Sequence, residues 1–168
     1  DQKFLRRSLD ASPDIKVDYV RLVDADAKRA ADLKDRFRRG RYDVYLLGDV
    51  DSSLFTPDEL KQLADAVKGG AGLAMLGGFH TFGPGGYDDT PLRDLIPVTM
   101  DPRERQRLGD PIRSDVQLAG PIVMRPTRPL GQRHYLMSLT TGGDRDKLWS
   151  QLPPLEGANK LGPPKPSA

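Results

Sequence analysis

The sequence predicts an α/β fold: a three-layer domain in which helices cover a mostly parallel sheet, followed by an irregular C-terminal segment. Two short apolar runs, residues 42–47 and 71–76, flank a segment with helical periodicity. Apolar runs without strict alternation are typical of strands buried on both faces. The order strand, helix, strand indicates a βαβ unit with a right-handed crossover. A glycine-rich stretch, residues 77–87, follows the second run and directs the search for function to the strand ends, where α/β sheets bind ligands.

The N-terminal third contributes three elements to this expectation. Apolar residues within 4–9 fall at helical spacing, and a Ser-Pro pair ends that helix. Residues 17–23 are rich in Val, Leu and Tyr and predict a strand. Residues 28–38 are heavily charged with a narrow apolar side, which predicts a surface helix ended by Gly40. Residues 42–47 are the next strand.

The central helix has the clearest start signal in the chain. Thr56 can cap it, Pro57 suits its first turn, and Glu59 completes a capping box. Apolar residues then recur on one face until Gly69 and Gly70 end the helix.

Beyond Tyr87 the pattern is weaker, because short apolar segments alternate with polar, Pro-rich and Arg-rich stretches. Trp149 is expected to anchor the C-terminal segment by packing. The expected elements are a short helix at 90–95, strands at 98–100, 120–124 and 134–139, an exposed loop at 101–110 and a helix at 144–151.

Composition restricts the function classes. The 168 residues suffice for one domain, and 26 Lys and Arg against 24 Asp and Glu give a net charge of +2, which offers no argument for a nucleic-acid partner. The absence of cysteine excludes disulfides, thiolate metal sites and a cysteine nucleophile. No run of about 18 apolar residues occurs, so we expect no direct membrane insertion by this fragment. No cofactor is indicated.

The two ends suggest a piece of a longer protein. The chain starts at Asp1 without an initiator Met, and its last residues are rich in proline. We therefore expect a domain over residues 1–160 and a Pro-rich linker or truncated continuation over 161–168. The sequence assigns no cellular compartment.

Two glycine-tipped strand ends form the candidate binding site. Gly48 and Asp49 end one strand, and Gly77 and Gly78 end the next. Adjacent strand ends of this kind can leave backbone amides facing a crevice that holds an oxyanion or a carboxylate. The alternative is that the glycines only permit tight turns. If Phe79, His80 and Phe82 were all buried against neighbouring helices, a purely architectural role would be favoured.

Polar side chains near this crevice have both a chemical and a structural interpretation. Asp49 and Asp51 can bind a hard metal or act as acid and base, but such residues more often cap turn amides. His80 can act as a base with Thr81 as the hydroxyl beside it, or serve as a hydrogen-bonded structural residue. His134 is the second histidine, and a metal site built on both is not expected. The glycines at 83–86 lack the Gly-Lys-Ser/Thr ending of a phosphate loop, so nucleotide binding is not expected.

Together these motifs resemble the class I glutamine amidotransferase-like family, whose members are often found in large bacterial proteins beside von Willebrand factor A domains. The resemblance covers about residues 1 to 166 of the chain. Its most specific part is the glycine-rich signature with the Thr-Pro-Leu that follows it. The segments that carry it are 42–51 (YDVYLLGDVD), 76–87 (LGGFHTFGPGGY), 90–92 (TPL) and 148–159 (LWSQLPPLEGAN).

The resemblance implies a flavodoxin-like doubly wound sheet. In true class I amidotransferases, the strand matching residues 73–76 leads to a cysteine nucleophile activated by a downstream histidine. Here Phe79 and His80 occupy that turn and no thiol is present, while His134 stands roughly where the downstream histidine would and is followed by Tyr135 rather than Pro-Glu.

We therefore expect a non-catalytic amidotransferase-like module of a larger bacterial protein. Its partners would be other domains of that protein or a small polar ligand, bound at Gly48, Asp49, Gly77, Gly78, His80 and Thr81. The alternative is an amide hydrolase or amidotransferase-type enzyme that uses a non-cysteine nucleophile or water near His80, with Thr81 and His134 as further candidate catalytic residues.

Overall fold

The chain combines helices with small parallel and antiparallel sheets. The structure is a computed structural model, and it describes residues 2–22, 33, 35–139 and 144–166. It divides into two units, one formed by Asp1–Ile112 with Leu161–Ala168 and the other by Arg113–Lys160. The single domain over 1–160 that the sequence predicted stays a prediction.

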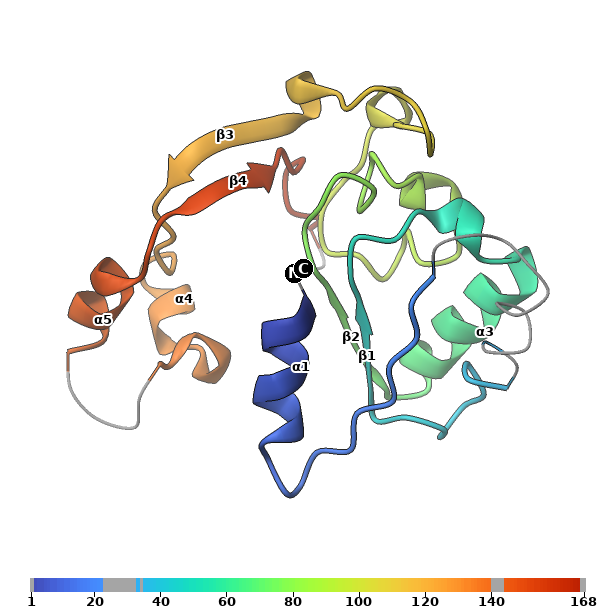
Figure 1. The fold of residues 1–168 in the computed structure, drawn as a ribbon, viewed down its shortest axis with the longest axis horizontal. Helices are drawn as coiled ribbons and strands as arrows, with labels where there is room; N and C mark the ends of the chain where they lie inside the picture. The colour runs from blue at the N-terminus through green and yellow to red at the C-terminus, as the bar shows by residue number, and fades with distance from the viewer. Residues whose placement is uncertain (1, 23–32, 34, 140–143, 167–168) are drawn as a thin grey trace. The chain divides into compact units, whose positions relative to one another are not determined.

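The first unit contains the predicted βαβ motif. Strand β1 (Val44–Leu47), helix α3 (Pro57–Lys68) and strand β2 (Gly72–Met75) follow one another, and β1 pairs with β2 in parallel (Figure 1). The register joins Val44 to Gly72 and Leu47 to Met75. The βαβ unit inferred from the two apolar runs is therefore confirmed, with each strand shorter than its run.

Helix α3 begins and ends where the sequence indicated. The Thr56 hydroxyl accepts a hydrogen bond from the Glu59 amide, and the Glu59 carboxylate accepts one from the Thr56 amide, so the capping box is confirmed. Pro57 occupies the first turn, and Gly69 follows the last. One face of the helix buries Leu60, Leu63, Ala64 and Ala66.

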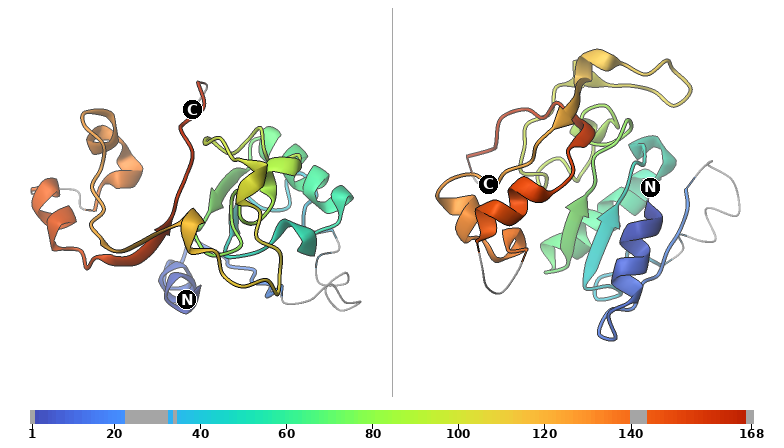
Figure 2. Two further views of the ribbon diagram at one scale, coloured as in Figure 1. Left: turned by 90° about the horizontal axis from the view of Figure 1, so that it is seen from above. Right: turned by 60° about the vertical axis from the view of Figure 1, so that its left-hand side comes forward.

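Helix α1 (Gln2–Asp10) confirms the predicted N-terminal helix. It lies on the side of the β1–β2 sheet opposite α3, as Figures 1 and 2 both show. Helices therefore flank this small sheet on both sides. Coverage on the α1 side is incomplete, because Val44 and Leu46 of β1 remain 57% and 44% exposed, whereas Tyr45 and Leu47 are buried on the α3 side.

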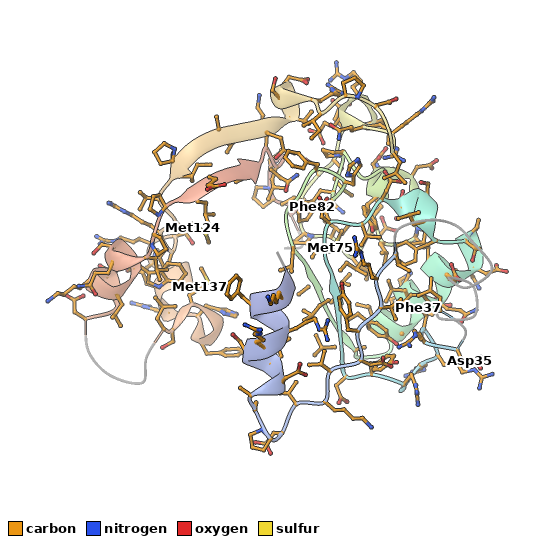
Figure 3. The ribbon with its side chains drawn as sticks, in the orientation of Figure 1. Asp35, Phe37, Met75, Phe82, Met124 and Met137 are labelled. Carbon is orange, nitrogen blue, oxygen red and sulfur yellow. The ribbon has the colours of Figure 1, made fainter. Side chains whose placement is uncertain are left out.

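The core of the first unit gathers around the inner faces of β1 and α3. Figure 3 shows Phe37, Met75 and Phe82 among its side chains. The fully buried members are Leu63, Tyr87 and Leu92, none of which exposes any of its surface. Partly buried side chains complete it, among them Val20 and Leu22.

Two predicted N-terminal elements differ in the structure. Residues 17–22 are extended and pack Val20 and Leu22 on the core, but they belong to no sheet, because their backbone groups pair with no strand among the described residues. The predicted strand is therefore wrong over 17–22, and residue 23 lies outside the described part. Most of the predicted helix 28–38 also lies outside it, while the described residues 35–38 form a turn in which Asp35 has a φ of 61° (Figure 3).

The segments after β2 are also less regular than predicted. A short 3₁₀ helix, Tyr87–Asp89, precedes successive turns over 90–95 instead of the predicted helix. These turns combine i+3 contacts, such as the Arg93 amide to the Thr90 carbonyl, with one i+4 contact from the Ile96 amide to the Leu92 carbonyl, and they do not continue as a helix. Residues 98–100 form no strand, since Val98 makes only an isolated bridge to Pro164.

The proline-rich tail belongs to the first unit. The Thr99 amide donates to the Pro163 carbonyl at 2.9 Å, and the Lys165 amide donates to the Pro97 carbonyl at 2.8 Å. Residues 161–166 therefore return to the first unit. The expectation of a Pro-rich linker or a truncated continuation over 161–168 stays a prediction.

The second unit is built on an antiparallel pair. Strands β3 (Gln117–Ile122) and β4 (Leu155–Asn159) pair with a register shift between Ala119 and Ile122. Gly120 lies at that shift, where a Cβ would overlap the carbonyl oxygens of Leu155 and Glu156. The predicted strand at 120–124 therefore exists but begins and ends earlier, and β4 was not predicted.

Short helices complete the second unit. Helix α5 (Arg145–Gln151) confirms the prediction at 144–151, and Asp144 caps it. The strand predicted at 134–139 is wrong, because helix α4 (Leu130–Arg133) leads into a 3₁₀ helix at Tyr135–Met137. Trp149 is 8% exposed and its Nε1 donates to the Met137 carbonyl at 3.0 Å, which confirms its packing role. A 3₁₀ helix at Ser114–Val116 precedes β3 in this unit, while the 3₁₀ helices at Ser52–Leu54 and Pro102–Glu104 belong to the first unit.

Candidate functional site

The two glycine-tipped strand ends lie beside each other. The Asp49 carboxylate, just after β1, accepts a hydrogen bond from the His80 amide at 2.6 Å, just after β2. Gly78 contacts the same carboxylate so closely that a Cβ there would overlap it. The parallel pairing of β1 and β2 therefore brings both predicted turns to one edge, and Asp49 joins them as a turn-capping residue.

The glycine-rich loop after β2 uses its own backbone amides. Gly85 donates to the Thr81 carbonyl, Gly86 donates to the Gly83 carbonyl, and Tyr87 donates to the Phe82 carbonyl, at 3.2, 2.9 and 3.1 Å. A backbone amide engaged in this way is no longer a donor for a bound anion. The loop is thus a compact, self-bonded turn over residues 81–87.

The conformation of this turn explains part of its composition. Gly86 has a φ of 74°, in the left-handed region that glycine adopts at little cost. Phe82 has a φ of 57°, which is unusual for a bulky residue, and its half-buried ring packs against the core (Figure 3). At Gly85 a Cβ would overlap the His80 carbonyl.

The loop is bonded to the turn that follows β1. The Ser52 amide donates to the Gly85 carbonyl at 2.9 Å, and the Ser52 hydroxyl donates to the Gly86 carbonyl at 3.1 Å. The Tyr87 hydroxyl donates to the Val50 carbonyl at 2.8 Å. Tyr87 is completely buried, and burial together with the carboxylates of Asp51 and Asp49 raises its pKa.

A buried ion pair closes the arrangement. The Arg105 guanidinium donates to both Asp51 carboxylate oxygens, at 2.6 and 2.8 Å, and also to the carbonyls of Pro84 and Gln106. The Asp51 side chain has no exposed surface and that of Arg105 is 28% exposed. Burial alone would raise the pKa of Asp51, but Arg105 and the Ser53 amide outweigh it, so the pKa lies below its ordinary value.

His80 and Thr81 are neighbours in sequence but are not paired. The His80 Nε2 lies 3.4 Å from the Gln106 side-chain nitrogen. Thr81 is completely buried, and its hydroxyl has no hydrogen-bond partner among the described residues. Gln106 itself is 1% exposed, so the predicted exposed loop at 101–110 is wrong at this position.

The remaining predicted residues divide by exposure and by unit. Gly48 is buried, whereas Asp49 and Gly77 are exposed and Gly78 is half-buried. His134 belongs to the second unit, where its exposed ring stacks on Tyr135 with 5.0 Å between the ring centroids. Nowhere in the described ranges do three or more His, Asp or Glu side chains gather as metal ligands would.

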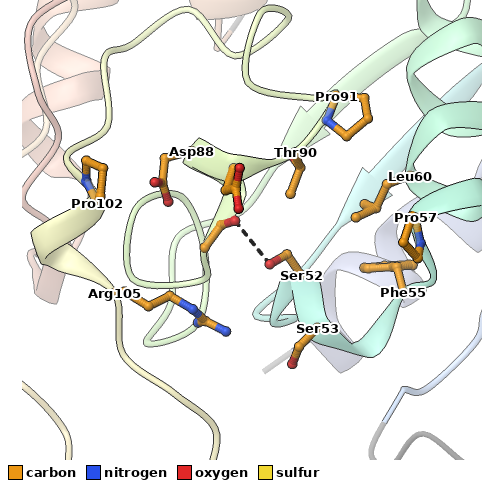
Figure 4. A pocket seen from close by; sticks show the side chains of 12 residues that line it. Ser52, Ser53, Phe55, Pro57, Leu60, Asp88, Thr90, Pro91, Pro102 and Arg105 are labelled. Carbon is orange, nitrogen blue, oxygen red and sulfur yellow. Dashed lines mark hydrogen bonds between the residues drawn. The ribbon is translucent and has the colours of Figure 1, made fainter.

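An open hollow of about 430 Å³ lies beside the loop (Figure 4). The buried side chains of Phe55 and Leu60 line the hollow. Figure 4 shows Ser52 and Arg105 on the side that faces the loop. Its acidic groups are those of Asp88 and Asp89. The remaining lining residues are Ser53, Pro57, Gly86, Thr90, Pro91 and Pro102.

Comparisons of the chain with protein families, with curated proteins and with solved structures gave no match. Within the described residues, no helix has the length and apolar character needed to cross a membrane.

Sequence reasoning missed the residues that hold the site together. Asp51 was singled out as a possible capping residue, but nothing in the local pattern connected it to Arg105, which lies 54 positions away. Arg105 and Gln106 stand in a charged stretch that resembles a solvated loop. No signal in the sequence distinguishes them from the residues of an exposed loop.

We predict that Thr81→Val will leave the fold intact and raise the free energy of unfolding by about 1 kcal/mol, because it replaces a buried unpaired hydroxyl with a methyl group of similar size. Urea denaturation followed by circular dichroism measures this. A loss of stability of similar size would show instead that the hydroxyl has a partner.

We predict that Asp51→Asn will lower the free energy of unfolding at pH 7 by about 2 to 3 kcal/mol, since it leaves the Arg105 charge partly buried and unpaired. The pKa of Asp51 is lowered on folding, so its contribution is complete above the unfolded value of about 3.9 and disappears as the pH falls through the lower folded value. Between pH 5 and pH 2 the variant should therefore lose less stability than the unchanged chain.

The exposed pair of Arg103 with Asp101 provides the matched control. Arg103→Gln should leave the urea midpoint at pH 7 unchanged within error. Parallel pH curves for the Asp51 variant and the unchanged chain would contradict the assigned role of Asp51.

Proposed function

We propose that this chain is a non-catalytic glutamine amidotransferase-like module that binds another domain of a larger bacterial protein, or a small polar ligand, at the carboxyl ends of β1 and β2. The observation that supports the proposal is the self-bonded loop over residues 81–87. It directly follows Phe79 and His80, which by the resemblance take the place of the amidotransferase nucleophile. The amides of Gly85, Gly86 and Tyr87 donate within the loop, and the Thr81 hydroxyl is buried. Such a loop suits a fixed binding surface better than a reaction centre.

We also propose that the βαβ motif belongs to a three-layer, flavodoxin-like sheet. The direct parallel pairing of β1 with β2 supports this, as do helices on opposite sides of that pair (Figures 1 and 2). The side of β1 that carries Val44 and Leu46 is apolar although it is partly exposed, which is typical of a strand buried on both faces.

The geometry around His80 does not support the version of the enzyme alternative in which Thr81 is the nucleophile. A hydroxyl nucleophile needs a base within about 3 Å and access to substrate. Thr81 is completely buried, and the His80 ring lies against the Gln106 amide rather than against a hydroxyl or carboxylate. A binding function requires neither access to Thr81 nor an active base.

The exposed part of the site suits contact with a protein surface. Asp49 and Gly77 are exposed, His80 is half-buried, and Phe79 between them is 44% exposed. The Asp49 to His80 hydrogen bond holds this segment in place. An aromatic ring displayed on a restrained loop loses little conformational freedom on binding, which is typical of residues that dominate interfaces.

We predict that the purified chain will not release ammonia from L-glutamine above the buffer blank, and that His80→Ala will give the same result. A coupled glutamate dehydrogenase assay measures this. Ammonia release that His80→Ala abolishes would overturn the proposal and favour the enzyme alternative.

We predict that a photo-cross-linking residue, p-benzoylphenylalanine, placed at position 79 will form a defined covalent adduct with another domain in the producing cell. The reason is that Phe79 is the exposed apolar group at the proposed contact. The same residue at position 58, an exposed site on α3, is the control and should give no such adduct. Equal labelling from both positions, or none from position 79, would contradict a contact here.

A further inference from the structure

The order of strands in the first unit leaves one position unaccounted for, provided that the flavodoxin-like fold proposed above is correct. In that fold the spatial order of strands is 2-1-3-4-5, so the first strand along the chain lies between the second and third. If residues 17–22 were the first strand, they would separate β1 from β2. Yet β1 and β2 pair directly. Residues 17–22 therefore match the second position, β1 the third and β2 the fourth.

The free edge of β1 has the backbone groups to accept the strand that this assignment requires. The carbonyls of Asp43 and Leu47 accept hydrogen bonds from the amides of Gly72 and Leu76, both at 2.8 Å. Backbone groups alternate between the two edges of a strand. The amides and carbonyls of Val44 and Leu46 therefore point to the edge of β1 that faces away from β2. At that edge β1 pairs with no strand among the described residues.

Residues 17–22 contact the first unit, but within the described part of the chain they pair with no strand. Val20 and Leu22 pack on the core, and the Asp18 carboxylate accepts a hydrogen bond from the Tyr42 hydroxyl and forms an ion pair with Arg36. These are side-chain contacts. A segment of strand composition whose backbone pairs with no strand among the described residues fits a strand whose neighbour is missing.

The helices supply an independent argument. Right-handed crossovers that run in opposite directions across a sheet place their helices on opposite faces. A crossover from the first to the second position runs opposite to one from the third to the fourth. Helix α1 precedes residues 17–22, α3 joins β1 to β2, and the two lie on opposite sides of the sheet (Figures 1 and 2).

We infer that the free edge of β1 is the docking site of one further β-strand, parallel to β1, which comes from a polypeptide segment outside residues 1–168 and leads into α1. Its chemistry follows from its place. Flanked by the Val44 and Leu46 side of β1 on one face and the Tyr45 and Leu47 side on the other, it must be apolar on both faces, as a run of four to six Val, Ile or Leu residues is.

Hydrogen exchange measured by NMR tests this inference. In the 168-residue chain, the amides of Val44 and Leu46 should exchange at least about tenfold faster than those of Tyr45 and Leu47, which face β2. The chain is then extended before residue 1 by Val-Ile-Val-Ile-Val and a three-residue Gly-Ser linker. This extension should slow the exchange of Val44 and Leu46 at least about tenfold.

A matched control replaces the two Ile residues of the extension with Pro, which cannot donate to a neighbouring strand. It should leave the exchange of Val44 and Leu46 fast. Three results would overturn the inference. The first is slow amide exchange of Val44 and Leu46 in the 168-residue chain together with slow exchange of residues 18–22, and the second is no effect of the Val-Ile extension. The third is protection from exchange that rises with protein concentration, which would assign the edge to a second copy. None of these readouts depends on ammonia release or on cross-linking at position 79, so failure of the proposed function would be seen separately.

Discussion

The buried ion pair between Asp51 and Arg105 is the interaction on which the arrangement around the strand ends depends. It joins the turn after β1 to a segment more than fifty residues later, and the same guanidinium reaches the Pro84 carbonyl of the glycine-rich loop. Three segments thus meet at one charged group. Because the Asp51 side chain has no exposed surface, its charge requires that partner, and the same partner also bonds the loop.

This dependence explains why the glycines of the loop after β2 serve a structural purpose. Close packing at Gly78 and Gly85 leaves no room for a side chain, and the left-handed Gly86 lets the chain turn back toward Ser52. A catalytic loop and a packing loop need the same residue for the same steric reason. What separates them is the direction in which the amides point, and the described amides over 85–87 point inward.

Local signals were sufficient for the elements that are stabilised locally. The capping box of α3, the apolar runs of β1 and β2 and the helices α1 and α5 all appear close to where the sequence placed them. Residues 17–22 and 134–139 have strand composition, but a strand also needs a partner, which composition does not reveal. The same limit applies to the site: Asp49 and His80 were found together because parallel strand ends meet, whereas Arg105 and Gln106 reach the site through a tertiary path that no local pattern records.

The return of the tail to Val98 has a consequence for how the chain can vary. Because Leu161–Ala168 is part of the first unit, the segment 113–160 departs from that unit and comes back to it. Closing a loop costs entropy that grows only with the logarithm of its length, about 0.6 kcal/mol for each doubling. Insertions or deletions in this segment should thus cost the βαβ motif little stability.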